Sequence, residues 1–165
     1  MAVDTHVNRG HPILFGLLIV FTIIEGAIST WLVNTYNRHN NYPDGSIRDR
    51  SRFICFLSWW TLVFSIIFVA LFQIKKDSIL TSVASHGIWL ILTWILWLAA
   101  AASITDALGG GLNCNEFDGA HCGQLNALEG FAWVNWILMT VATAVAVALL
   151  VRSVRRGDRF TGALV

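Results

Sequence analysis

The sequence predicts an all-α integral membrane protein, a four-helix transmembrane bundle with both termini in the cytoplasm. Three observations predict this fold. The chain of 165 residues is 56% hydrophobic and only 13% charged, whereas a soluble domain carries about 25% charged residues. Its apolar residues fall into four blocks, each long enough to cross a hydrocarbon layer of about 30 Å as a helix. Basic residues are more numerous on the side that carries both tails.

This composition excludes several classes of protein. So few charged residues cannot cover the surface of a water-soluble domain, which excludes a cytosolic enzyme domain and a disordered chain. The net charge of +1 provides no basic surface, so we expect no nucleic-acid partner. We expect residues 1–165 to form a single domain.

The predicted spans cover residues 12–34, 53–74, 84–106 and 131–151, with outer loops at 35–52 and 107–130. Inside lipid the backbone must satisfy its own polar groups, so these segments are predicted to be helices. A β-barrel would instead need alternating apolar and polar residues. The first span is too long for a cleavable signal peptide and contains an acidic residue, Glu25.

The distribution of basic residues predicts the orientation. Four spans place both tails and the 75–82 loop on one side of the membrane. That side carries seven basic residues: Arg9, Lys75, Lys76, Arg152, Arg155, Arg156 and Arg159. The other side carries four: Arg38, Arg48, Arg50 and Arg52. Because basic residues are retained in the cytoplasm, both tails are predicted to be cytoplasmic.

Two cysteines lie in the second outer loop. Cys114 and Cys122 have seven residues between them, and thiols this close on the oxidising side of a membrane are expected to form a disulfide. Their spacing matches neither a zinc signature nor C-x-x-C, so metal binding and redox exchange are less favoured alternatives. Cys55, in the second span, is expected to be a small buried apolar residue.

Glu25 is the most informative polar residue. A carboxylate near the bilayer centre is costly, so it is usually paired, protonated or directed at a polar cavity. No Lys or Arg lies at this depth, where the polar residues are Thr61, Ser65, Thr93, Ser103, Asn135 and Thr140. We expect a neutral carboxyl that hydrogen-bonds across helices as structural glue. The alternative is a site that handles protons, ions or lipid headgroups.

The outer loops carry opposite charges. The 35–52 loop contains Arg50 and Arg52, whereas the segment from Asp106 to Glu129 has no Lys or Arg. We expect Arg50 or Arg52 to reach Asp106 or Glu129, each such pair being worth under about 1 kcal/mol. The alternative is that these charges link neighbouring protomers.

Small residues and basic residues mark the fourth span and the tail. Helices in lipid associate through small residues, and the fourth span has two such pairs, Ala142 with Ala146 and Ala144 with Ala148. We expect one pair to face the bundle and the other to face lipid or a second copy. The tail residues Arg152, Arg155 and Arg156 resemble a patch for anionic lipids, or else they are the charged stop of the last helix.

No catalytic motif is found. The chain contains no H-E-x-x-H, no G-x-S-x-G and no P-loop, because Gly109–Gly111 lacks the Lys-Ser/Thr that follows in a phosphate cradle. Only His86 of five histidines enters a span, so a pair of haem-ligating histidines is missing. Trp94 and Trp97 share one helix side as a packing stripe or, alternatively, a ligand shelf. We expect no catalytic, cofactor or metal site.

Three stretches together resemble a known family. They are residues 51–56 before the Trp-rich second span, residues 97–108 at the end of the third, and Cys114 with the segment CGQLNALEGFAW, residues 122–133. In this order and spacing, between Pro12 and Arg159, they resemble a fungal-type MARVEL domain, the four-helix module of MAL and related proteins for vesicle traffic and membrane link. Glu25 matches no signature of that family.

The resemblance implies membrane organisation in sterol- and sphingolipid-rich domains, vesicles, animal cell junctions or fungal plasma-membrane furrows, without catalytic residues. We therefore expect a non-enzymatic protein of the plasma membrane or secretory vesicles that binds lipids or a sterol and forms homo-oligomers. The alternative is a small proton- or ion-coupled transporter or channel that uses Glu25. One buried acid, no repeat between the halves and no Gly/Pro-broken helix speak against that alternative.

Overall fold

The fold is a bundle of four long helices, seen in a computed structural model. The structure describes residues 2–74, 83–117 and 119–155. Over these residues the helices are α1 (Ala2–His39), α2 (Gly45–Ile74), α3 (Val83–Leu108) and α4 (Cys122–Arg155). All four are long and apolar enough to cross a membrane. The predicted all-α bundle of four transmembrane-length helices is confirmed.

The helices run beyond the predicted spans. α1 continues past residue 34 to His39, α2 begins at Gly45 instead of residue 53, and α4 begins at Cys122 instead of residue 131. The connections between them are therefore shorter than the predicted outer loops. The physical reason is that charged residues end the apolar stretch but not the helix, because polar and basic residues are tolerated in helix turns that leave the lipid.

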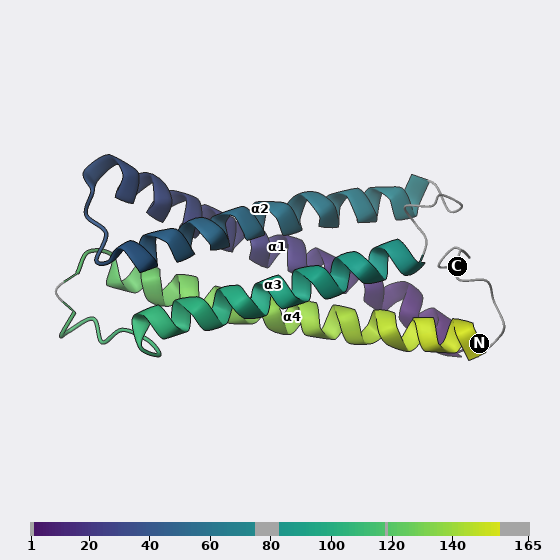
Figure 1. Cartoon of the computed structure of the whole chain (residues 1–165). Helices are drawn as coiled ribbons and strands as arrows, with labels where there is room; N and C mark the ends of the chain where they lie inside the picture. The colour runs from purple at the N-terminus through teal and green to yellow at the C-terminus, as the bar shows by residue number, and fades with distance from the viewer. Residues whose placement is uncertain (1, 75–82, 118, 156–165) are drawn as a thin grey trace.

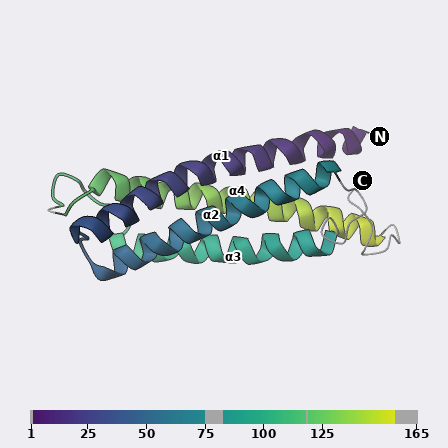
Figure 2. The ribbon, with the colours of Figure 1, turned by 90° about the horizontal axis from the view of Figure 1, so that it is seen from above.

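The helices pack in a ring in which each has two neighbours. α1 packs against α2 and α4, and α3 also packs against α2 and α4. Figures 1 and 2 show all four running along the bundle, with consecutive helices in opposite directions. One end, which we call the loop end, carries the connections 40–44 and 109–121. The start of α1 and the end of α4 lie together at the opposite end, which we call the tail end (Figure 1).

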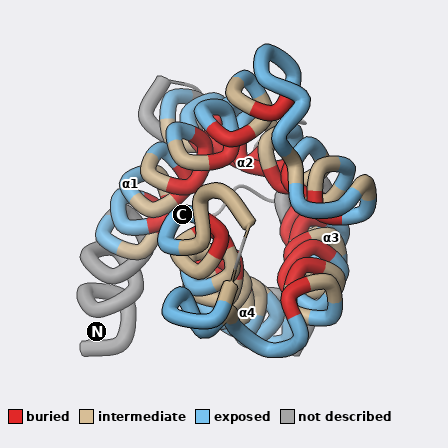
Figure 3. Tube along the Cα trace, turned by 90° about the vertical axis from the view of Figure 1, so that its left-hand side faces the viewer, coloured by how far each residue is buried: buried red, intermediate tan, exposed pale blue. Residues whose placement is uncertain are grey.

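Buried residues face the middle of the ring and apolar residues also cover its outside. Figure 3 shows the buried residues on the helix faces that are turned toward one another. The outside carries large exposed apolar side chains on all four helices, among them Ile23, Ile66, Ile95 and Ile137. Nine polar or charged side chains are buried in the described interior. An apolar exterior around a partly polar interior fits a protein whose solvent is lipid.

Glycines end α3. The amide of Gly110 donates to the carbonyl oxygen of Thr105 at 3.0 Å, and Gly109, Gly110 and Gly111 all have positive φ. A left-handed glycine after the last helical turn is a common way to satisfy the final carbonyl groups. The three glycines therefore stop the helix and turn the chain toward the disulfide loop.

Candidate functional site

The middle of the bundle carries polar side chains that all four helices direct inward. The apolar spans cover Ile13–His39, Gly45–Ala70, Gly87–Leu108 and Cys122–Ala148. Each span has a residue at most 1% exposed within one residue of its midpoint: Glu25, Ser58, Trp97 and Asn135. Because neighbouring helices are antiparallel, these midpoints lie at a similar depth. We call these four residues the mid-span layer.

Glu25 lies on the inner face of α1, one turn from Thr22 on one side and from Ser29 on the other. All three are fully buried. The hydroxyl of Thr22 donates to the carbonyl oxygen of Leu18 at 2.8 Å, and that of Ser29 to the carbonyl oxygen of Glu25 at 2.7 Å. Neither carboxyl oxygen of Glu25 has a hydrogen-bond partner among the described residues. The cross-helix hydrogen bond expected for this carboxyl is therefore not formed there, because the nearby hydroxyls donate within their own helix.

Two other helices also bring polar groups to the interior. α1 and α2 approach closely beside Glu25, since a Cβ on Gly26 would lie 3.5 Å from Ser58 Cβ. Ser65, two turns further along α2, is fully buried, and its hydroxyl has no hydrogen-bond partner in the described chain. Neither amide atom of Asn135 on α4 has one either. An amide or hydroxyl buried without a partner costs about 1–3 kcal/mol.

Five tryptophans tie neighbouring helices together through threonines. In each pair the indole N–H donates to a threonine hydroxyl on the next helix. The pairs are Trp59 with Thr30, Trp60 with Thr93, Trp97 with Thr61, Trp94 with Thr140, and Trp133 with Thr105, at 2.8–3.4 Å. Trp94 and Trp97, predicted to form either a packing stripe or a ligand shelf, both take part in this packing. Sequence reasoning missed these pairs because they depend on the register between helices.

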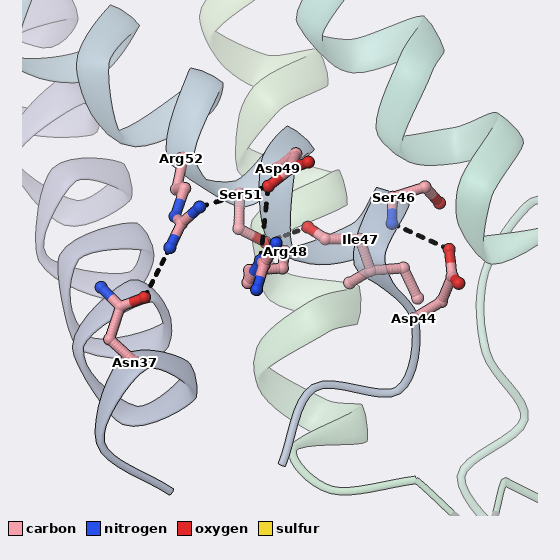
Figure 4. Close-up of polar contacts among 8 residues, drawn as sticks. All are labelled: Asn37, Asp44, Ser46, Ile47, Arg48, Asp49, Ser51 and Arg52. Carbon is pink, nitrogen blue, oxygen red and sulfur yellow. Dashed lines mark hydrogen bonds and ion pairs between the residues drawn. The ribbon is translucent and has the colours of Figure 1, made fainter. Parts of the chain in front are cut away.

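The start of α2 is held by polar contacts at the loop end (Figure 4). The carboxylate of Asp44 accepts a hydrogen bond from the backbone N–H of Ser46 at 2.9 Å. Hydrogen bonds from the side chain and the backbone of Ser46 lower the pKa of Asp44. This is an N-cap, which satisfies an amide that the helix itself leaves free. Sequence reasoning missed it because α2 was expected to begin eight residues later.

Of the ion pairs expected across the outer loops, the structure forms the one between Arg50 and Asp106. Arg50 donates to Asp106 at 3.3 Å, which joins the start of α2 to the end of α3. Arg52 instead donates to Asn37 at 2.6 Å and to Asp49 at 3.3 Å. Within the described chain Glu129 makes no ion pair; its carboxylate lies beside Gly111. Arg52 turns toward α1 because it lies in helix α2 and not in a flexible loop.

The disulfide loop is fastened to α4. Cys114 and Cys122 form the predicted disulfide, with their Cα atoms 5.6 Å apart. The side-chain amide of Asn126 both accepts from the backbone N–H of Leu112 and donates to its carbonyl oxygen, each at 2.8 Å. His121 has a positive φ of 69°. Its ring packs edge-on against Trp31 of α1 at 4.9 Å.

The small residues of α4 face two directions. Ala142 is buried and Ala146 packs against the core, so this pair lies inside the bundle. Ala144 and Ala148 are exposed. Arg152 and Arg155 lie in the last turns of α4, whereas Arg156 lies outside the described residues.

The described interior contains hydrogen-bonding side chains but no cluster of metal-ligating residues. Within residues 2–74, 83–117 and 119–155, no group of three or more His, Cys, Asp and Glu is placed to hold a metal ion. Its hydrogen-bonding groups include one carboxyl, one amide and several hydroxyls.

The comparison with family models agrees with this fold. Residues 8–145 match the MARVEL model, described as a membrane-associating domain. The match covers all four apolar spans but for the last three residues of the fourth. The comparisons with curated proteins and with solved structures returned no match. The four apolar helices and the matched residues lead to one conclusion: the chain belongs to the MARVEL family of membrane-associating domains.

Proposed function

We propose that this protein organises domains of the plasma membrane or of vesicle membranes, without enzymatic activity, through lipid association and homo-oligomeric assembly. The observation that supports this proposal most is the exterior of the bundle. Large apolar side chains are exposed on every span, and only 22–39% of the residues in the most apolar window of each span are buried inside the protein. A small bundle with this much lipid-facing surface can order the lipids around it.

The outward side of α4 is the proposed contact between copies. Ala144 and Ala148 are exposed one turn apart, and small residues at this spacing allow two helix backbones to approach closely. α4 also has the smallest buried share of the four spans, 22%. We place both tails in the cytoplasm, where Arg152, Arg155 and Arg156 would attract anionic lipids at about 1 kcal/mol per basic residue.

Native mass spectrometry of gently extracted protein tests the proposal, because it reports copy number and retained lipids together. We expect oligomers that carry bound lipid or sterol. The double variant Ala144→Leu with Ala148→Leu should shift the distribution toward monomers, because larger side chains separate the helices. Ile137→Leu, an exposed apolar exchange on the same helix, is the matched control and should leave it unchanged. Strict monomers without bound lipid would contradict the proposal.

A further inference from the structure

The two sides of the loop end carry opposite charge. Residues 37–52, at the end of α1 and the start of α2, include four arginines and two aspartates. Residues 106–129, at the end of α3 and the start of α4, include four carboxylates and no lysine or arginine. The first segment therefore has a formal charge of +2 and the second of −4. Within the described chain, one ion pair joins the two segments, that between Arg50 and Asp106.

Arg52 lies on the edge of the bundle between α1 and α2. Its guanidinium donates to Asn37 of α1 at 2.6 Å and to Asp49 of α2 at 3.3 Å. The side chain stays 44% exposed, and a guanidinium has five N–H donors, so it can bind another carboxylate. Arg38 is exposed two residues after the buried Tyr36 and makes no ion pair among the described residues. We call Arg38 and Arg52 the basic edge.

Glu129 lies on the edge between α3 and α4. One turn further along α4, the indole of Trp133 donates to Thr105 of α3 at 2.9 Å, which identifies this side of the helix. Glu129 is half-buried beside Gly111, and Glu116 is exposed in the disulfide loop. Neither carboxylate makes an ion pair in the part of the chain that the structure describes. We call Glu116 and Glu129 the acidic edge.

The basic and acidic edges lie on opposite sides of the ring and at a similar depth. Each helix packs against the two next to it, so the edge between α1 and α2 is opposite the edge between α3 and α4 (Figure 3). Arg52 directly precedes the apolar stretch 53–74, and Glu129 lies two residues before the stretch 131–151. At a rise of 1.5 Å per residue, both lie within about 3 Å of the start of their apolar stretch. Two copies with the same orientation in one membrane can therefore bring these edges together.

The charges determine which edges can meet. A two-fold axis along the membrane normal would place an edge of one copy against the same edge of the other. Arg52 would then face Arg52, or Glu129 would face Glu129, and such contacts between like charges are unfavourable. A head-to-tail contact instead joins unlike edges. Ala144, fifteen residues after Glu129, lies about 60° around α4 from it, so the outward small residues lie on the same side as the acidic edge.

We propose that copies of this protein assemble head to tail, with the basic edge of one copy against the acidic edge of the next. The ion pair between Arg52 and Glu129, which does not form within the protomer, forms between copies. This inference rests on the proposed homo-oligomeric assembly and names the surface that the outward side of α4 meets, the edge between α1 and α2. Because each contact uses two different edges, copies add in rows or close into a ring in the membrane plane.

Co-purification of two differently tagged full-length copies from membranes tests the proposal. Unaltered copies should co-purify. Arg52→Glu or Glu129→Arg brings like charges together at every contact between identical variants, so neither variant should co-purify with itself. In a mixture of the two variants every contact again joins a carboxylate to a guanidinium, so the mixed copies should co-purify. Lys76→Glu changes the charge as Arg52→Glu does, but between α2 and α3; it is the matched control and should co-purify with itself.

Cross-linking measures the same contact without reversing a charge. In a Cys55→Ala background, a short bismaleimide should join a copy carrying Arg52→Cys to a copy carrying Glu129→Cys, and should not join two copies of the same variant. The head-to-tail contact is overturned by equal co-purification in every combination, or by cross-linking that is no greater between the two variants than within either. It is also overturned if the mixed charge variants stay apart although each elutes as a folded monomer. Unaltered copies that do not co-purify would contradict homo-oligomeric assembly as well.

Discussion

The indole of Trp97 is fully buried, and its N–H donates to the hydroxyl of Thr61 at 3.0 Å. Helices in lipid gain little from apolar burial, so such bonds contribute directly to association. We expect Trp97→Phe and Thr61→Val to show a coupling free energy of about 0.6 kcal/mol, the average for membrane hydrogen bonds. A double-mutant cycle on the free energy of unfolding in detergent measures it. Purely additive single variants would contradict a stabilising role for this bond.

The two small-residue pairs of α4 should respond differently to enlargement. Ala142 is 4% exposed, so Ala142→Leu overpacks the bundle and should lower the free energy of unfolding by about 1–3 kcal/mol. Ala144 is exposed, so Ala144→Leu should leave the unfolding free energy of the protomer nearly unchanged. The free energies of unfolding of the two variants can be compared in detergent under conditions in which the protein is monomeric. If both variants lost the same free energy of unfolding, Ala142 would not lie on the side of α4 that packs inside the bundle.

Single residues differ in how far the sequence alone predicts them. The burial of Glu25 follows from its place in an apolar span, and the structure places it fully inside. That its carboxyl lacks a partner in the described interior does not follow, because it depends on the rotamers of Ser29 and other neighbours. The Trp–Thr pairs need the register between helices, which no local pattern contains.

The sequence predicts where the helices cross the membrane better than it predicts where they begin and end. Hydropathy locates where each helix crosses lipid but not where it stops, because the backbone continues through charged turns. Asp44 and Gly109 are the local signals for the start of α2 and the end of α3. Both are typical cap residues. The sequence identifies Asp44 and Gly109 as cap residues only if the helices are assumed to extend beyond the hydrocarbon layer.

The cap at Asp44 makes the start of α2 sensitive to acid. Hydrogen bonds from Ser46 lower the pKa of this carboxyl in the folded protein, so the stabilisation is present at pH values above its ordinary pKa. It is lost as the pH falls through the lowered value. We expect the amides of residues 46–48 to lose hydrogen-exchange protection in that acidic range. Asp44→Asn keeps an acceptor that does not titrate, so its protection relative to α3 should not change with pH.

The whole molecule is the scale at which the sequence is most informative. Four apolar blocks with short connections permit few arrangements other than an antiparallel bundle, and the structure has this architecture. The orientation in the membrane rests on the count of basic residues. The disulfide offers a way to test it, because both of its cysteines lie at the loop end.

We predict that the loop end faces the outside of the cell. In a Cys55→Ala background, intact cells treated with an impermeant reductant should react with an impermeant maleimide at Cys114 and Cys122. Labelling is expected there because the predicted topology exposes that loop to the medium. For protein located at the cell surface, a reaction that requires permeabilised cells would mean that the orientation is inverted and the tails face outward.

The Trp–Thr hydrogen bonds join three of the four pairs of neighbouring helices: α1 with α2, α2 with α3, and α3 with α4. No bond of this kind among the described residues joins α1 to α4, where the rings of Phe21 and Phe131 lie 6.0 Å apart. Among the described residues, α1 and α4 are therefore the neighbouring helices that no Trp–Thr hydrogen bond joins. If the bundle opened between α1 and α4, it would open between the helices that carry Glu25 and Asn135. The buried polar interior would then be exposed laterally to the bilayer.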